Sequence, residues 1–318
     1  MEKQHTKTPI KFIAISLCTC KRPKMLEKAL KSLETISIPE NIIIEVLVVD
    51  NDKNQSAKEI VFAYQKNSRY EVHYHTEPKR GLSFARNKVL EEAAKLGASH
   101  ILFFDDDEYL ATDCLKSHID FYNENENAII ISGPTINVFA PNTPNYIMKN
   151  IVFTQTTTKQ HKNIRKTCAA GNVFFPISLY TKFGIKFSEE YVFMGGEDGD
   201  FFGRASKAGF TIVWNSNAII YEEVPKARTT PEYIFKKCYY NGYAGAFNRI
   251  KEKKKRQISY AIKNIFLLFI NCLLLIPSII MGRTVFLNML GICLRTKGKI
   301  DGSLSSKPYN FYKKIYGE

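Results

Sequence analysis

Residues 100–110 read HILFFDDDEYL, an apolar run that ends in four consecutive acids. The run Ile101 to Phe104 is short and wholly apolar, which is typical of a strand buried in a parallel sheet. The four acids, Asp105 to Glu108, cannot be buried beside that strand without partners, because each desolvated charge costs several kcal/mol or more. We therefore expect them at the open carboxyl end of the strand, where ligands bind in α/β sheets.

A cation held by this acidic motif is the first functional hypothesis. Clustered carboxylates repel one another unless a cation joins them, and ligands that are all oxygen favour a hard ion, Mg²⁺ or Mn²⁺. The alternative is an acidic strand-to-loop turn that binds nothing. A second apolar strand, Ile42 to Val49, is also followed by acids, Asp50 and Asp52. Two acidic strand ends favour a ligand crevice over an isolated acidic turn.

Strand and helix patterns alternate as far as residue 221. Expected strands cover 11–19, 42–49, 70–75, 101–104, 128–132, 210–214 and 218–221. Helices are expected from Pro23, over 56–67 and 113–123, and after Ser83 as N-cap, the last of these ending at Gly97. Residues 134–165, rich in Asn, Thr and Pro, are expected to be irregular and to form part of an acceptor-side wall. The alternation predicts a doubly wound α/β sheet.

A further acidic segment begins a helix late in this part of the chain. Residues 191–209 read YVFMGGEDGDFFGRASKAG, and Glu197, Asp198 and Asp200 lie in the expected first turn, where the helix dipole favours negative charge. That preference is enough to explain Asp200. For Asp198, the flexible Gly195–Gly196 turn and the acidic strand ends elsewhere favour a chemical role instead.

Composition limits the classes of partner. The chain of 318 residues carries 45 basic and 31 acidic side chains, a net charge of +14 that implies an anionic partner. Nucleic acid is disfavoured because no zinc-finger spacing or aromatic RNA-binding motif is present, and no P-loop or GxGxxG fingerprint is found. The seven scattered cysteines indicate reduced thiols in a cytosolic environment, and the N-terminus does not read as a signal peptide.

The chain changes character after residue 225, so we predict two parts, 1–225 and 226–318. A basic run at 251–256, KEKKKR, precedes an apolar stretch at 262–281 and a shorter one at 284–294. Basic residues beside an apolar helix mark the cytoplasmic side of a membrane and attract anionic headgroups. Two helices in the interface, or a re-entrant hairpin, fit these lengths better than two full spans. A buried soluble helix pair is the alternative.

The ordered set of motifs resembles family 2 glycosyltransferases with the GT-A fold, most closely those that build bacterial surface polysaccharide. The matching segments are ISLCTCKRP (15–23), VLVVDND (46–52), GLSFARN (81–87), FFDDDE (103–108), AAGNVFF (169–175) and GGEDGDFFGRASKAG (195–209). The resemblance implies a GT-A sheet domain followed by a helical, membrane-associated extension. It also implies a nucleotide-sugar donor, a saccharide or lipid-linked acceptor, a Mn²⁺ or Mg²⁺ ion, and a location on the cytoplasmic face of the inner membrane.

The resemblance also implies roles for individual residues. Donor contacts would come from Thr19, Arg22, Asp50, Asp52, Arg86, Asn87, Asp105 and Asp106. Asp105 to Asp107 correspond to the family's DxD motif, with Asp107 on the metal and Asp105 as a further ligand that also faces the ribose. Asp198 corresponds to the catalytic base, with Glu197 beside it, and in-line attack would invert the anomeric carbon.

Two departures from the family pattern affect these expectations. Many relatives carry a His after the late strand, where this chain has Tyr221-Glu222-Glu223; either Glu222 replaces that His or the site has no such ligand. The QxxRW motif of processive synthases is absent, which favours transfer of one sugar. UDP is the expected nucleotide, with deoxythymidine and guanosine diphosphates left open. The competing hypotheses are a nucleotidyltransferase on a similar sheet and a non-catalytic membrane-bound partner of an assembly complex.

Overall fold

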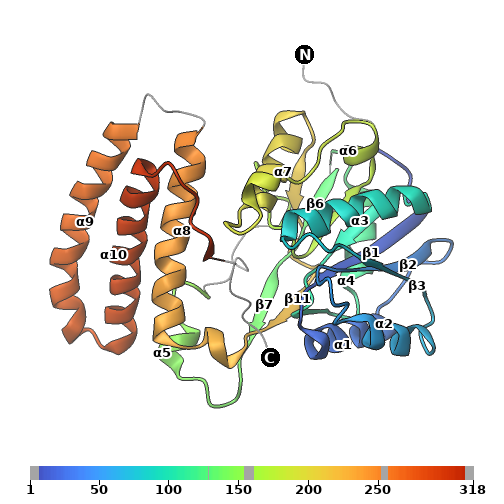
Figure 1. Ribbon diagram of the computed structural model, residues 1–318, viewed down its shortest axis with the longest axis horizontal. Coiled ribbons are helices and arrows are strands. Elements are labelled where there is room, and N and C mark those ends of the chain that lie inside the picture. The colour runs from blue at the N-terminus through green and yellow to red at the C-terminus, as the bar shows by residue number, and fades with distance from the viewer. Residues whose placement is uncertain (1–6, 128, 154–160, 252–256, 312–318) are drawn as a thin grey trace.

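The computed structural model describes residues 7–127, 129–153, 161–251 and 257–311 of the chain (Figure 1). Over these residues, eight strands form one mixed sheet in the order β3-β2-β1-β4-β9-β6-β10-β8, and three form a second sheet in the order β5-β11-β7. The larger sheet contains β1 (Phe12–Thr19), β2 (Ile43–Asp50), β3 (Glu71–Thr76), β4 (His100–Phe103), β6 (Ile130–Ser132), β8 (Ile164–Arg165), β9 (Val173–Pro176) and β10 (Ile212–Trp214). The smaller contains β5 (Glu108–Leu110), β7 (Thr135–Val138) and β11 (Ile220–Glu223).

Helices cover both faces of the larger sheet, which explains its continuous apolar strands. Along β1, Ile13 and Ile15 face the side that carries α1 (Pro23–Ser32), α2 (Lys58–Gln65) and α4 (Cys114–Glu124). The intervening Ala14 faces the side that carries α3 (Leu82–Leu96), α6 (Ser178–Thr181) and α7 (Glu197–Lys207). Short turns of helix add η1 (Leu33–Thr35), α5 (Asn145–Met148), η3 (Glu189–Tyr191) and η4 (Lys226–Arg228). The predicted doubly wound α/β sheet is confirmed.

Strand pairing brings the predicted acidic ends together. β1, β2 and β4 run parallel, so the residues that follow them meet at one edge of the sheet. The smaller sheet brings a further acid to this edge. β11 pairs antiparallel with β5, which places Glu222 opposite Glu108. The residue that stands where relatives have a His is therefore a cross-strand neighbour of the acidic motif.

Two local predictions were wrong. Ser83 is not the N-cap of α3, which starts at Leu82 with Gly81 as its cap. Gly81 has φ +146°, donates its N–H to Asn51 Oδ1 at 2.6 Å, and leaves no room for a Cβ beside Val192. Residues 134–165 are not wholly irregular, since they include β7, α5 and β8; residues 154–160 lie outside the described part. β7 and β8 are strands only through distant partners, β11 and β10, which local sequence patterns do not reveal.

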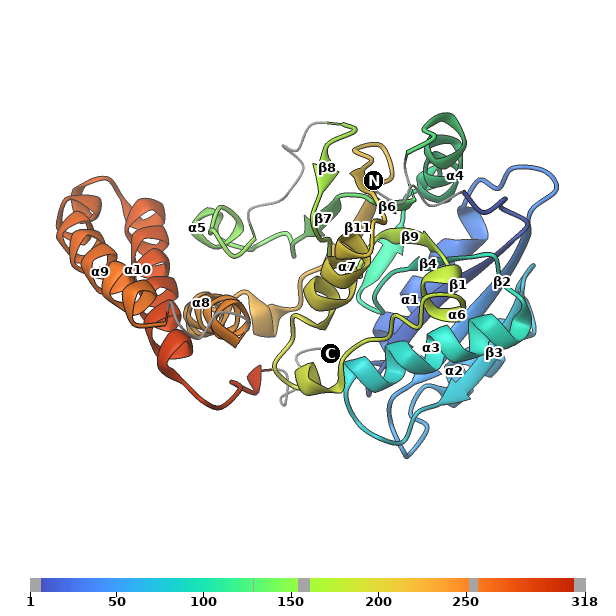
Figure 2. The same cartoon turned by 90° about the horizontal axis from the view of Figure 1, so that it is seen from above.

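Three long helices form an arm beside the sheets: α8 (Pro231–Lys251), α9 (Gln257–Ile280) and α10 (Arg283–Leu304). α10 lies between α8 and α9, and α9 is outermost (Figures 1 and 2). Phe266, Phe269 and Ile276 on α9 are 62–68% exposed, so the arm is not a buried helix pair. The basic run at 252–256 falls outside the described residues. The boundary at residue 225 stays a prediction, although β11 ends at Glu223 and the helices follow.

Candidate active site

A cavity of about 460 Å³ opens at the carboxyl edge of the parallel strands. Its lining includes Thr19, Arg22, Arg86, Asp105, Asp107, Glu197 and Asp198 among the residues predicted for the site. The structure thus brings together side chains from four separate segments: the ends of β1 and β4, the start of α3, and the start of α7. Asp50, Asp52, Asn87 and Asp106 lie outside the lining.

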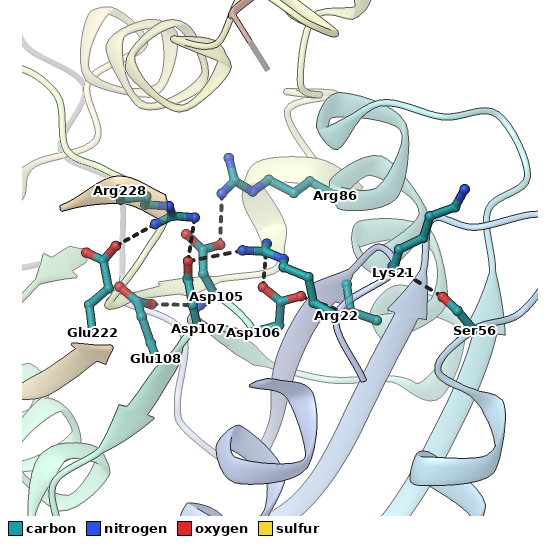
Figure 3. Close-up of polar contacts among 11 residues, drawn as sticks. Lys21, Arg22, Ser56, Arg86, Asp105, Asp106, Asp107, Glu108, Glu222 and Arg228 are labelled. Atoms are coloured by element: carbon teal, nitrogen blue, oxygen red, sulfur yellow. Dashed lines mark hydrogen bonds and ion pairs between the residues drawn. The ribbon is translucent and has the colours of Figure 1, made fainter. Parts of the chain in front are cut away.

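Two arginines converge on Asp107 (Figure 3). Arg22 Nη1 lies 3.1 Å and Arg228 Nη2 lies 2.9 Å from Asp107 Oδ2. Arg22 also pairs with Asp106 at 2.5 Å, and Arg228 pairs with Glu222 at 3.0 Å. Asp107 is therefore the shared carboxylate of two ion-pair systems, one built on the end of β1 and the other on the segment after β11.

Asp106 points into the protein rather than into the cavity. Its side chain is fully buried, and the hydroxyl of Thr19 donates to its Oδ2 at 2.7 Å. Burial raises the pKa of Asp106 to about 7, although Arg22 acts in the opposite direction. This carboxyl group therefore anchors Arg22 and Thr19 in place, and its effect on a bound donor would pass through them.

Arg86 holds a second pair of acids. From within α3 it reaches Glu197 Oε1 at 2.5 Å and Asp105 Oδ1 at 3.2 Å. Burial would lower the pKa of Arg86, but the carboxylates of Asp105 and Glu197 raise it. The charged guanidinium thus ties the acidic motif after β4 to the first turn of α7, and it brings Asp198 to the same cavity.

Glu108 shapes the acidic motif from inside. Its Oε2 accepts the N–H of Asp105 at 2.7 Å, and its Oε1 accepts the hydroxyl of Thr135 at 3.3 Å. Burial raises the pKa of Glu108, and it raises that of Glu222 to about 7. In contrast, although burial opposes it, the guanidinium groups of Arg228 and Arg22 lower the pKa of Asp107. Of Glu108, Glu222 and Asp107, only Asp107 thus has a lowered pKa, and it is the residue predicted to bind the metal.

The polar groups after β2 serve the loops around the cavity. Asp50 accepts hydrogen bonds from the N–H groups of Ala57 at 2.8 Å and Asp52 at 3.1 Å, and from the Tyr74 hydroxyl at 3.0 Å. Asp52 accepts the N–H of Asn54 at 3.3 Å. The cavity-lining residue of this loop is the intervening Asn51. The predicted donor contacts of Asp50 and Asp52 stay predictions.

Asn87 has a positioning contact instead of a place in the cavity. Its side chain exchanges two hydrogen bonds with the backbone of Phe187, of 2.9 and 2.8 Å, which fastens α3 to the segment before α7. Its predicted contact with the nucleotide stays a prediction. The arrangement shows how α3 can orient both Arg86 and the turn that carries Glu197 and Asp198.

Asp198 and Asp200 differ sharply in their surroundings. Asp198 lines the cavity, and its Oδ1 accepts the N–H of Gly199 at 2.7 Å. Asp200 pairs with Arg204 one turn along α7, at 2.9 Å. The helix start accounts for both acids electrostatically, but Asp198 alone of the two faces the cavity.

Three cavity-lining residues come from beyond residue 225 and were missed from the sequence: Arg228, Tyr233 and Lys237. They belong to η4 and α8, which were expected to serve membrane association only. No local pattern distinguishes Arg228 from the many basic residues nearby. Arg228 lies shortly after β11, and only the pairing of β11 with β5 shows that this part of the chain is beside the acidic motif. Burial lowers the pKa of Lys237.

The donor set of the cavity suits a divalent metal ion. Asp105, Asp107 and Glu222 offer carboxylate oxygens alone, the ligands that Mg²⁺ and Mn²⁺ prefer. Arginines separate these acids here. Among the described residues, only Glu45, Glu71 and His73, on β2 and β3, bring three ligand atoms within 4.8 Å of one another. A metal in the cavity would therefore compete with Arg22 and Arg228 for the carboxylate oxygens of Asp107.

Comparison with known proteins identifies the class. The family model described as glycosyl transferase family 2 matches residues 14–183, and that of glycosyl transferase family group 2 matches residues 100–294. The chain belongs to glycosyltransferase family 2 and is a glycosyltransferase, as the sequence motifs predicted. A curated relative, the succinoglycan biosynthesis protein ExoM of Rhizobium meliloti (strain 1021), is 28% identical over 230 residues, which are 72% of each chain.

Solved structures confirm the GT-A fold. S. aureus TarS 1-349 has a TM-score of 0.52 and 19% identity over 73% of this chain, which spans 65% of the TarS chain. That enzyme has also been solved in complex with UDP-GlcNAc, with a TM-score of 0.53 and 18% identity over 73% of this chain and 66% of the other. The mannosyltransferase PcManGT from Pyrobaculum calidifontis, in complex with GDP-Man and Mn²⁺, has a TM-score of 0.55 and 16% identity, covering 80% of this chain and 68% of its own.

Proposed function

We propose that this glycosyltransferase is inverting and metal-dependent, and that it moves one sugar from a UDP-linked donor to a saccharide or lipid-linked acceptor in surface-polysaccharide synthesis. The observation that carries the proposal is the position of Asp198. It lines the same cavity as Asp105 and Asp107, from a separate helix start, so that an acid and a candidate metal motif would face a substrate bound there. The similarity to a succinoglycan biosynthesis protein supports the polysaccharide context.

The donor's diphosphate would bind beside the acidic motif. Arg22, Arg86 and Arg228 line this part of the cavity and supply positive charge for phosphate oxygens. Asp107 and Asp105 would hold the metal ion, with Glu222 available as a further ligand. When bound, the ion supplies Lewis-acid stabilisation to the departing diphosphate.

Asp198 would act on the acceptor. An acceptor hydroxyl is a weak nucleophile until a positioned carboxylate takes its proton. The hydrogen bond from the Gly199 N–H holds Asp198 Oδ1, and the helix start favours its negative charge. As the acceptor oxygen bonds to the anomeric carbon, its proton passes to Asp198 and the bond to the diphosphate breaks. Attack from the side opposite the leaving group inverts that carbon.

The arm would hold the enzyme against the cytoplasmic face of the membrane. Among the described residues, α9 is the one helix long and apolar enough to cross a bilayer. However, α8, α10 and the sheets stand beside α9 over the same height (Figure 1). An upright α9 would carry the charged residues of α8 to the same depth in the bilayer, which is costly. α9 lying in the interface, with its outer face in the lipid, avoids this cost.

Turnover of sugar nucleotides with and without Mn²⁺ tests the proposal. Metal-dependent transfer of sugar, with release of a nucleoside diphosphate and inversion at the anomeric carbon, is the expected result. Release of pyrophosphate would instead indicate a nucleotidyltransferase. No turnover with any donor would indicate a non-catalytic partner. A thermal-shift screen of UDP-, deoxythymidine diphosphate- and GDP-sugars with Mn²⁺ identifies the donor, since a ligand that binds the folded state stabilises it.

A further inference from the structure

Arg228 links the predicted metal ligands to the start of the helical arm. It lies in η4, between β11 and α8, and its guanidinium reaches Asp107 Oδ2 at 2.9 Å and Glu222 Oε1 at 3.0 Å (Figure 3). These are the carboxylates that the proposed function gives to the metal ion. A metal ion and this guanidinium therefore compete for the same oxygens.

The other two arginines at the acids are anchored elsewhere. Arg22 is fixed by Asp106, a carboxylate with no exposed surface that also accepts the Thr19 hydroxyl. Arg86 is itself 5% exposed and is fixed by Glu197. In contrast, Arg228 is supplied by a three-residue 3-10 turn, and the two partners described above both belong to the metal-binding set. Of the three, Arg228 is thus the one that contacts two of the carboxylates expected to bind the metal ion.

We propose that Arg228 is a donor-binding residue that exchanges partners: it holds Asp107 and Glu222 before the donor arrives, and it binds the donor's diphosphate once the metal ion takes those carboxylates. The inference rests on the proposed function. A guanidinium that gives up these two carboxylates to a divalent cation can pair with the donor instead, because a diphosphate offers the same planar, charge-assisted pairing as a carboxylate. The exchange keeps charges balanced with and without donor.

This exchange gives the arm a part in catalysis. Arg228 is followed directly by α8, which packs against α10, and Tyr233 and Lys237 of α8 also line the cavity. The segment that would hold the enzyme on the membrane therefore also contributes the cation that would bind the donor's leaving group. The predicted division at residue 225 would cut through the donor site.

Arg228→Gln tests the exchange by two affinities that should change in opposite directions. The affinity for Mn²⁺ alone, from electron paramagnetic resonance titration, is expected to rise about threefold or more, because a competitor for Asp107 is gone. The affinity for UDP in saturating Mn²⁺, from calorimetry, is expected to fall about 10- to 100-fold, the range for one charged hydrogen-bonding group. Inorganic pyrophosphate, which lacks the base, should show the same loss. Lys226→Gln removes an equal charge from the same turn and should change neither affinity.

The remaining outcomes decide against the inference or against its basis. A parallel loss of both affinities in a folded Arg228→Gln protein would show a structural role, and two unchanged affinities would also overturn the exchange. If Arg228→Gln does not fold, Arg228→Lys keeps the charge but loses the two-pronged geometry; it should bind Mn²⁺ more tightly and UDP more weakly than the wild type, and equal affinities would overturn the exchange. A wild-type protein that binds UDP without any Mn²⁺ dependence would contradict the proposed function itself.

Discussion

Asn288 on α10 is hydrogen-bonded to Ile151: the N–H of Ile151 donates to Asn288 Oδ1 at 3.0 Å. The Asn288 amide also donates to the carbonyl oxygen of Lys149 at 3.2 Å. The next residues, Val152 and Phe153, line the cavity. The middle helix of the arm thus holds a segment that contributes to the cavity wall, and this segment belongs to residues 134–165, the predicted acceptor-side wall.

Loss of this contact should weaken use of the acceptor. Asn288→Ala removes two hydrogen bonds, each worth about 0.5–1.5 kcal/mol, so we expect the KM for the acceptor to rise about three- to tenfold. Donor affinity should not change, since Arg22 and Asp107 do not depend on this segment. Asn271→Ala is the matched control, because Asn271 bonds Thr296 inside the arm and does not touch the wall. Equal changes in both variants would indicate general loosening of the arm.

Close packing of α8 against α10 should be sensitive to a single methyl group. A Cβ at Gly242 would lie 1.9 Å from the carbonyl oxygen of Arg295, whereas a Cβ at Gly245 would meet nothing within 4 Å. We expect Gly242→Ala to lower the free energy of unfolding by about 1–3 kcal/mol, the usual cost of overpacking. Gly245→Ala should be neutral or stabilising by up to about 1 kcal/mol, because Ala favours a helix. If denaturant titrations gave Gly242→Ala and Gly245→Ala the same free energy of unfolding, the close approach of α8 to α10 at Gly242 would be contradicted.

Membrane binding should depend on the outer face of α9. Phe269 is 62% exposed there, and replacing it by Glu puts a charge where we expect lipid. Burying one such side chain contributes about 1.5–3 kcal/mol, so Phe269→Glu should reduce sedimentation with anionic vesicles at least tenfold. Ile164→Glu on β8, at a residue 72% exposed on the sheet domain, should leave sedimentation unchanged. Full-length protein that does not sediment with vesicles at all would rule out the interfacial arrangement.

Sequence patterns predicted the features that depend on neighbouring residues, but not those that depend on residues far apart in the chain. The strand before Asp105 and the helix start at Asp198 are local patterns, and the structure has both. The cross-strand pairing of Glu222 with Glu108 is not local, because it joins residues more than a hundred positions apart. Arg228 could not be found for the same reason. Sequence shows that basic residues are abundant after residue 225, but not which of them turns back to an acid.

Asp50 and Asn87 illustrate the opposite limit. Motif resemblance predicted a donor contact at both positions, yet motifs do not say which atoms a side chain will contact. In the structure, the Asp50 carboxylate closes the loop after β2, and the Asn87 amide holds Phe187. Residues in a shared motif can thus shape the walls of a site, and the neighbouring Asn51 is the one that lines it.

The metal motif should be testable without turnover. Asp107→Asn removes an anionic ligand while nearly keeping the shape, and we expect Mn²⁺ affinity to fall at least tenfold with the fold intact, since even changes behind the ligands cost about 10–100-fold. Asp120→Asn is the control, because Asp120 forms an exposed ion pair with Lys116 on α4. Calorimetry with Mn²⁺ alone measures the metal affinity of each variant, and thermal unfolding shows whether its fold is intact. Unchanged affinity in Asp107→Asn would mean that the metal ligands lie elsewhere.

The role of Asp198 can be separated from the electrostatics of its helix. Asp198→Asn and Asp200→Asn both remove a negative charge from the first turn of α7, where each charge is worth only about 0.3–1 kcal/mol of stability. Asp198 lines the cavity, whereas Asp200 is held by Arg204. If Asp198 is the base, its replacement should slow sugar transfer about 10²–10⁴-fold, with donor and metal affinity nearly unchanged. Asp200→Asn should have a much smaller effect.

Single-turnover transfer to acceptor, measured beside donor affinity for both variants, distinguishes the two roles. Similar mild losses in both would indicate that the acids serve the helix alone. Near wild-type transfer by Asp198→Asn would move the base to another group, and Glu197 is the next candidate by position. However, Glu197 is buried and lies 2.5 Å from Arg86, which keeps its carboxylate occupied. The half-exposed Asp198, with one oxygen held by the Gly199 N–H, is better placed to accept the proton of an incoming hydroxyl.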